Sequence, residues 1–91
     1  MRFLVPHDHP ALAGHFPGNP VVPGVVVLDQ VVAAIEARHG ALPPLRLPQV
    51  KFLAPLLPGQ EAQVDLEGDD GRWRFTVTRG GTRIATGEVA T

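Results

Sequence analysis

The sequence predicts an α+β domain in which an antiparallel sheet of about five strands curls around one central helix. Two observations lead to this prediction. Residues 61–91 alternate between apolar and polar side chains and are interrupted by glycine-containing turns, which is typical of an antiparallel meander with one buried face. The one segment typical of a long helix, residues 24–39, has apolar residues on all sides of its axis, which is typical of a buried helix.

We expect one domain, spanning residues 1–91, because the chain is shorter than most single domains. A core of this size is marginal by itself, and the chain has no cysteine for disulfides, so we expect oligomerisation to stabilise it. With 44% hydrophobic residues, 19% charged residues and a formal net charge of −1, the chain is neither disordered nor a strongly basic nucleic-acid binder. The lack of cysteine and of a long apolar run predicts a cytoplasmic protein with no membrane partner.

The predicted helix has residues typical of a helix start at one end and of a helix end at the other. It begins at Gly24, directly after Pro23, which is a residue that favours the start of a helix. Arg38 and His39 lie in the last turn, where cations complement the helix dipole, and Gly40 follows as the terminating residue. We therefore expect the helix to cover residues 24–39.

The strands are predicted from alternation and from turn residues, with irregular connections at residues 6–24 and 41–47. The strand candidates are residues 2–5, 48–54, 61–67 and 72–78, and a last strand through Ile84 and Val89. In the second of these segments, the side chains expected on one face are Val50, Phe52 and Ala54. In the third and fourth, the side chains expected to point inward are Ala62, Val64, Leu66, Trp73, Phe75 and Val77. Tight turns are expected at residues 68–71 and 79–81.

Asp29 is a carboxylate in the most apolar part of the predicted helix. An ionised carboxylate in apolar surroundings costs free energy unless it is paired, and burial favours its protonated form. Such a group suits a general acid. The alternative interpretation, that Asp29 lies at a subunit interface or a rim and accepts ordinary hydrogen bonds, stays open.

Two further features could contribute to chemistry near this helix. His15 lies fourteen residues before Asp29, in a loop rich in glycine and proline, and histidine transfers protons readily near neutral pH. A histidine on a loop is, however, more commonly a solvated surface residue. Gly24 begins the helix, so its N–H has no acceptor within the helix and could donate to a carbonyl oxygen that gathers negative charge.

These residues resemble the signature of the hotdog-fold 3-hydroxyacyl-[acyl-carrier-protein] dehydratases. Residues 15–24 read His-Phe-Pro-Gly-Asn-Pro-Val-Val-Pro-Gly, and the acid Asp29 follows at the family's spacing. A second stretch, residues 51–59, reads Lys-Phe-Leu-Ala-Pro-Leu-Leu-Pro-Gly and is similar to the family's motif after the central helix. The resemblance therefore covers residues 15–59 and implies a hotdog fold, in which the sheet wraps around the helix.

The resemblance implies dehydration of a 3-hydroxyacyl thioester to a trans-2-enoyl thioester. His15 would remove the C2 proton, Asp29 would protonate the departing C3 hydroxyl, and the amide of Gly24 would bind the thioester carbonyl. The family places the histidine and the acid of one site on different subunits. The neighbouring residues expected to bind substrate are Phe16, Pro23 and Val25.

The resemblance also implies the partners. We expect an acyl carrier protein that presents the hydroxyacyl chain on phosphopantetheine, and a homodimer or a heterodimer with another hotdog subunit. We expect no cofactor, no metal and no nucleic acid. The acid is Asp29, where the main dehydratase branch has Glu, and the chain is short for the family. Short stand-alone members are similar to dehydratases of specialised pathways, such as those of aryl polyene pigments.

Other interpretations of single motifs remain. His7, Asp8 and His9, together with His15, could form a metal cluster, although no later residue completes a ligand set. The repeated proline steps before the helix are more typical of a rigid connector than of a polyproline ligand. Four arginines give the second hairpin a basic character that could dock an acidic carrier, and the alternative is an ordinary solvated strand face; they are Arg72, Arg74, Arg79 and Arg83.

Three alternatives to a dehydratase stay open at the level of function. One is an accessory hotdog subunit without activity, against which the intact pair of His15 and Asp29 argues. The others are thioester hydrolysis and enoyl-CoA hydration on the same fold, and analysis of the product distinguishes them from dehydration.

Overall fold

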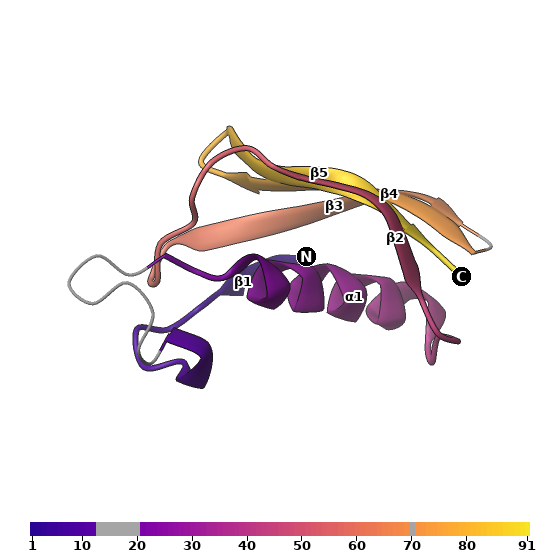
Figure 1. Cartoon of the computed structure of the whole chain (residues 1–91), viewed down its shortest axis with the longest axis horizontal. Coiled ribbons are helices and arrows are strands. Elements are labelled where there is room, and N and C mark those ends of the chain that lie inside the picture. Colours follow the sequence, from indigo (N-terminus) through magenta and orange to yellow (C-terminus); the bar gives the residue numbers. More distant parts are fainter. Residues whose placement is uncertain (13–20, 70) are drawn as a thin grey trace.

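The computed structural model of the chain describes residues 1–12, 21–69 and 71–91. Figure 1 shows one helix lying along the length of a single antiparallel sheet, as the sequence predicts. The elements, in chain order, are β1 (Arg2–Leu4), the 3₁₀ turn η1 (Pro10–Leu12), α1 (Gly24–His39), β2 (Arg46–Phe52), β3 (Glu61–Asp69), β4 (Arg72–Arg79) and β5 (Thr82–Ala90).

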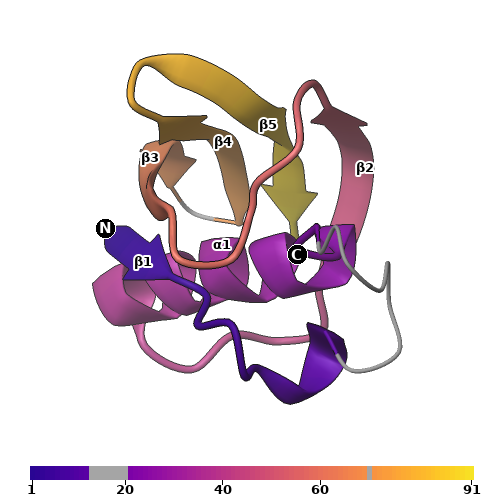
Figure 2. The ribbon, with the colours of Figure 1, turned by 90° about the vertical axis from the view of Figure 1, so that its left-hand side faces the viewer.

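The five strands lie in the order β1-β3-β4-β5-β2, and each pairs antiparallel with its neighbours. The hairpins β3–β4–β5 form the predicted meander, and its second turn contains Gly80 and Gly81 in the left-handed conformation that glycine tolerates (φ 54° and 85°). Viewed from the end, the sheet curves over α1, with β1 and β2 at its two edges (Figure 2). The expected arrangement of sheet and helix is confirmed.

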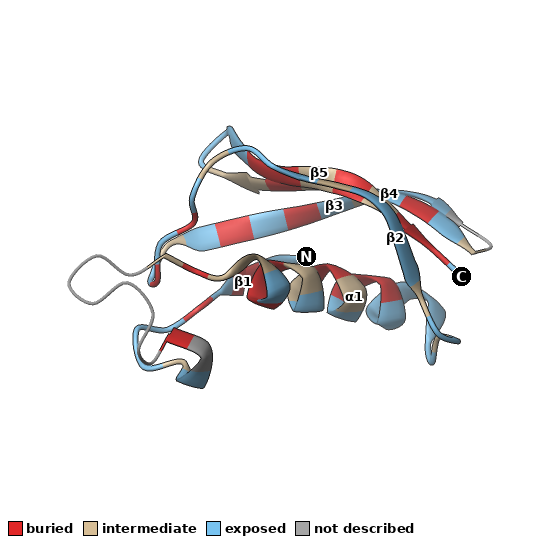
Figure 3. Cartoon of the chain, in the orientation of Figure 1, coloured by how far each residue is buried: buried red, intermediate tan, exposed pale blue. Residues whose placement is uncertain are grey.

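The core lies between the concave face of the sheet and α1. Side chains along β3 and β4 alternate between buried and exposed, as the pattern of apolar residues predicts (Figure 3). Phe75 and Val77 on β4 are fully buried, and so are Val31 and Ile35 on α1 (0% exposed). Each such side chain contributes about 1.5–3 kcal/mol by leaving water. The apolar alternation of the second half of the chain is therefore what positions the helix.

The bounds of α1 match the prediction, but the expected burial on all sides is wrong for the single chain. One side of α1 packs on the sheet, and the opposite side is open to solvent. We call this the outer face of α1; its exposed residues are Val25, Asp29, Ala33 and Glu36. The physical reason is that one sheet layer covers only one side of a helix. Among the described residues, no helix has the length and apolarity to cross a membrane.

Strand β2 also differs from its prediction. It covers residues 46–52 and not 48–54, and it is an edge strand whose residues are mostly exposed. Phe52, expected on the same face as Val50 and Ala54, is 52% exposed, while Val50 and Ala54 are half-buried against the core. Pro48 lies within β2, where the register with β5 shifts, and an edge position tolerates its missing N–H.

A polar contact fixes the C-terminal end of α1 to the sheet. The indole Nε1 of Trp73 donates a hydrogen bond to Nε2 of His39 at 3.1 Å, and the two rings meet edge to face with their centroids 5.0 Å apart. Trp73 is 2% exposed, so its N–H depends on this acceptor, because water has little access to it.

We expect His39→Ala and Trp73→Phe each to lower the free energy of unfolding by about 1 kcal/mol, because each removes the partly buried hydrogen bond. The double variant should cost less than the sum of the two single variants, since the bond can be lost only once. Urea unfolding followed by circular dichroism measures all three. Glu36→Ala, an exposed change on the same helix, is the control and should shift the free energy by less than about 0.5 kcal/mol. Strict additivity of the two single changes would contradict this coupling.

Candidate functional site

The N-terminus of α1 offers backbone donors that the helix itself does not use. Gly24 follows Pro23 directly, and no side chain caps this end. The amides of Val26 and Val27 both donate to the carbonyl of Pro23, at 3.0 and 3.4 Å. The first amides of a helix have no acceptor in a preceding turn, so those of Gly24 and Val25 can bind an external oxygen. The helix dipole favours an oxygen that carries negative charge.

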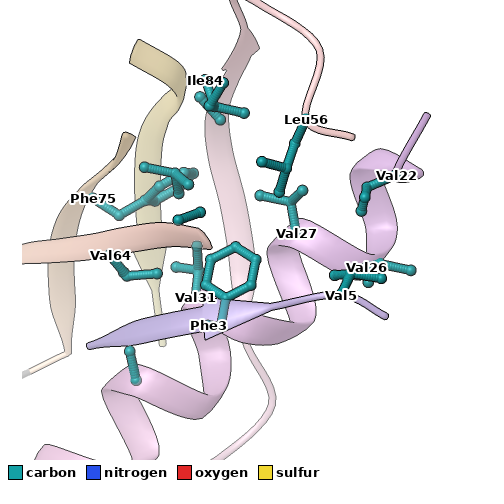
Figure 4. Close-up of a cluster of buried hydrophobic side chains, with 14 of the residues drawn as sticks. Phe3, Val5, Val22, Val26, Val27, Val31, Leu56, Val64, Phe75 and Ile84 are labelled. Carbon is teal, nitrogen blue, oxygen red and sulfur yellow. The ribbon is translucent and has the colours of Figure 1, made fainter. Parts of the chain in front are cut away.

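Backbone hydrogen bonds hold this end of the helix against the loop that follows β2. The amide of Val22 donates to the carbonyl of Leu56 at 2.8 Å. The amides of Leu53 and Ala54 donate to the carbonyl of Ile84, at 2.8 and 3.4 Å, which ties the same loop to β5. The side chains of Val27, Leu56 and Ile84 lie together inside this frame (Figure 4). These hydrogen bonds and side-chain contacts therefore hold the start of α1 in place against the loop and β5.

An apolar pocket of about 370 Å³ opens beside the start of α1. The described side chains that line it are all apolar, so it suits a hydrocarbon group better than a charged one. The lining residues are Val21, Val22, Pro23, Gly24, Val27, Phe52, Ala54, Pro55, Leu56 and Ile84. The arrangement brings amide donors for an oxygen next to a compartment for an apolar chain, which is what an acyl thioester requires.

The structure places the predicted site residues in different surroundings. Pro23 and Gly24 line the pocket, whereas Val25 does not and is 64% exposed on the outer face of α1. Asp29 is exposed on that same face, so in the single chain it is not buried among valines, and its position fits the other interpretation left open, a place at an interface or a rim. It follows Gly24 by five residues, which is about 140° around the helix. One chain therefore does not present the Asp29 carboxylate to its own pocket.

His15 and Phe16 lie outside the described residues, so their predicted roles stay predictions. Phe52 is not among the expected site residues, because the alternation around it indicates only a strand with Val50, Phe52 and Ala54 on one face. The signal that could have indicated a role was its place in the motif at residues 51–59, directly after Lys51. What alternation could not show is that the ring reaches Gly24, which is distant in sequence.

The metal hypothesis gains no support from the described residues. Among them, no three His, Asp or Glu side chains gather as ligands. The ring of His7 lies instead against Gly59, where an added Cβ would be 2.7 Å from the His7 Cε1 atom. His15, the fourth member of the hypothetical cluster, lies outside the described part of the chain.

Two of the arginines on the second hairpin have acidic partners. The side chains of Arg72 and Arg74 lie 3.6 and 3.8 Å from the carboxylate of Glu88 on the neighbouring strand. Such exposed pairs contribute little stability, but they offset part of the basic charge on this face. This arrangement favours the interpretation as a solvated strand face for these two residues.

The sequence of this chain matches a known protein family. The family model described as ApeI-like, ApeI dehydratase, matches residues 1–88. The 3-hydroxyacyl-[acyl-carrier-protein] dehydratase FabZ of Myxococcus xanthus is 31% identical over 96 residues, which cover 89% of this chain and 63% of the relative. The corresponding protein of Magnetococcus marinus is 30% identical over 99 residues, which cover 94% and 62%. The chain thus spans less than two thirds of the length of these curated relatives.

A solved structure has the same fold. A chain of the dehydratase heterocomplex ApeI:P from Xenorhabdus doucetiae superposes with a TM-score of 0.80 and 23% sequence identity, over 98% of this chain and 81% of that chain. The expected hotdog fold, an antiparallel sheet wrapped around one long helix, is confirmed.

Proposed function

This chain belongs to the family of ApeI-like dehydratases, and we propose that it dehydrates a 3-hydroxyacyl thioester on an acyl carrier protein to the trans-2-enoyl thioester. The observation that carries the proposal is the glycine-started helix N-terminus beside an apolar pocket. It supplies donors for a thioester oxygen at the entrance to a compartment for the acyl chain. The sequence places a histidine and an acid at the spacing of the dehydratase signature around it.

The reaction removes one molecule of water from C2 and C3 of the acyl chain. His15 takes the proton from C2, and negative charge develops on the thioester oxygen, where the amide of Gly24 stabilises it. The electron pair from the broken C–H bond forms the C2–C3 double bond as the C3–O bond breaks. Asp29 gives its proton to the departing hydroxyl, which leaves as water. The atoms and electrons of this reaction therefore balance without an external oxidant or cofactor.

The position of Asp29 supports an active site shared between two chains. The carboxylate lies on the outer face of α1, turned about 140° around the helix from Gly24. A second subunit that contacts both edge strand β2 and this face would bring its own pocket or its own histidine to Asp29. We therefore place His15 and Asp29 of one site on different subunits.

The partner subunit is either a second copy or another hotdog chain. Edge strand β2 is the most suitable place for it, because β2 is seven residues long and exposes Leu47 and Phe52, at 44% and 52%. The opposite edge strand, β1, has only three residues. The structural neighbour named as a heterocomplex fits pairing with a different hotdog subunit as well as with a copy.

The substrate class follows from the pocket and from the relatives. The apolar lining fits a hydrocarbon acyl chain, and the relatives named above are dehydratases of carrier-linked 3-hydroxyacyl groups. The reaction serves fatty-acid-like or polyene biosynthesis, the aryl polyene type included. A chain without cysteine suits the reducing cytoplasm, where we place the reaction.

We expect His15→Ala and Asp29→Asn each to lower turnover of a 3-hydroxyacyl carrier thioester by about 10²-fold or more, because each removes a proton-transfer group. Mass spectrometry of the carrier-bound chain reports the loss of water and distinguishes it from hydrolysis of the thioester. Glu36→Gln is the matched control, since Glu36 is an exposed acid on the same face of α1, and it should leave turnover within about twofold.

A wild-type protein that acts on no such thioester, alone or with a second hotdog subunit, would contradict the catalytic role. The accessory-subunit interpretation would then be the better one. Full activity of Asp29→Asn would instead remove Asp29 from the mechanism and leave the reaction class intact.

We expect the wild-type chain to behave in light scattering as an assembly larger than its mass of 9.7 kDa, either alone or mixed with its hotdog partner. Leu47→Lys should shift it toward the single chain, because a charge on an edge strand opposes pairing. Leu4→Lys is the matched control, since Leu4 is a similarly exposed leucine (50%) on the opposite edge strand, and it should leave the mass unchanged. An active protein that stays a single chain would contradict the shared site.

A further inference from the structure

The ring of Phe52 lies directly against the first residue of α1. A Cβ added to Gly24 would be 2.6 Å from Cζ of Phe52 and 3.0 and 3.1 Å from its two Cε atoms. These three atoms form the tip of the ring, so the ring points at the Cα of Gly24. A methyl group at position 24 would therefore overlap with the ring, and the ring would have to move.

The backbone itself does not require glycine at position 24. Gly24 is not among the glycines with positive φ, and it opens a regular helix. Alanine favours a helix more than glycine does. The three atoms nearest to an added Cβ all belong to the ring of Phe52. The physical reason for glycine at this position is thus the approach of the ring.

Phe52 also separates the pocket from the open edge of the sheet. It is the last residue of β2, the edge strand, and it pairs with Ala85 of β5, whose small side chain is fully buried. Phe52 is 52% exposed and is the one aromatic residue among the described residues that line the pocket. Three of the other walls, Val27, Leu56 and Ile84, are aliphatic side chains buried in the core (Figure 4). Replacing Phe52, which lies on an edge strand, therefore changes the width of the pocket without opening a cavity in the core.

We propose that Phe52 determines acyl-chain specificity by limiting the width of the pocket beside the Gly24 amide. This inference rests on the proposed function, in which that amide binds the thioester oxygen and so fixes C2 and C3 of the chain nearby. The ring then meets the first carbons beyond C3. A straight chain passes it, whereas a chain branched at C4 collides with it.

The test compares two carrier-linked substrates, 3-hydroxyhexanoyl and the branched 3-hydroxy-4-methylpentanoyl thioester. Phe52→Ala should raise the ratio of kcat/KM for the branched over the straight substrate by about tenfold or more, since a single carbon in an apolar pocket is discriminated to that extent. Leu53→Ala is the matched control, because Leu53 is the next residue, is equally exposed (52%) and does not line the pocket. It should leave the ratio unchanged.

An unchanged ratio in Phe52→Ala, with the wild type active, would overturn the specificity role and leave the proposed function standing. Equal shifts in the Phe52 and Leu53 variants would also overturn it, because they would indicate a general loosening of the loop. If the wild type itself acts on neither substrate nor on any other hydroxyacyl thioester, it is the proposed function that fails.

A second measurement tests the contact without any substrate. Gly24→Ala should lower the urea midpoint of unfolding in the wild-type background, because its methyl group displaces the ring. In the Phe52→Ala background the same change should leave the midpoint unchanged or raise it, since the obstacle is gone and alanine favours the helix. Equal effects of Gly24→Ala in the two backgrounds would overturn the claim that Phe52 requires glycine at position 24.

Discussion

The packing of one long helix against one concave sheet is the constraint on which the rest of this structure depends. Apolar side chains of β3, β4 and β5 meet the inner side of α1 and form the core, as Val64, Phe75 and Val31 illustrate (Figure 4). A single layer cannot cover the other side of the helix. The chain therefore keeps an exposed helix face and an exposed edge strand, and the proposed second subunit would cover both.

The packing of the helix on one sheet also explains why the pocket and Asp29 lie on different sides of α1. The helix N-terminus is held by loop contacts on the inner side, where the apolar pocket lies, while Asp29 is on the outer side. In the single chain the Asp29 carboxylate is open to solvent. Only a partner that covers this face would change its surroundings. In the proposed shared site, the catalytic role of Asp29 would depend on the presence of the second subunit.

A contact between edge strand β2 and the first residue of α1 forms part of the pocket wall. Phe52 is at the end of β2, and Gly24 begins α1, so any shift of the edge strand would move the wall of the pocket. The edge strand β2 is also the edge proposed to meet the partner subunit. Binding of that subunit could therefore move Phe52 and so change the shape of the pocket. The absence of a side chain at Gly24 is what allows the two elements to approach so closely.

The sequence by itself determined the helix from Gly24 to His39, the meander of the second half and its inward residues, because periodicity and end signals act locally. It also identified Gly24 as a donor, since the first residue of a helix has an unused amide. Tertiary structure alone decided that Asp29 is exposed, that β2 is an edge strand and that Phe52 touches Gly24. The alternation of apolar and polar residues indicates which side chains share a face of a strand, but it does not indicate what covers that face. Burial depends on the number of layers, and contacts between distant residues depend on how the strands are ordered.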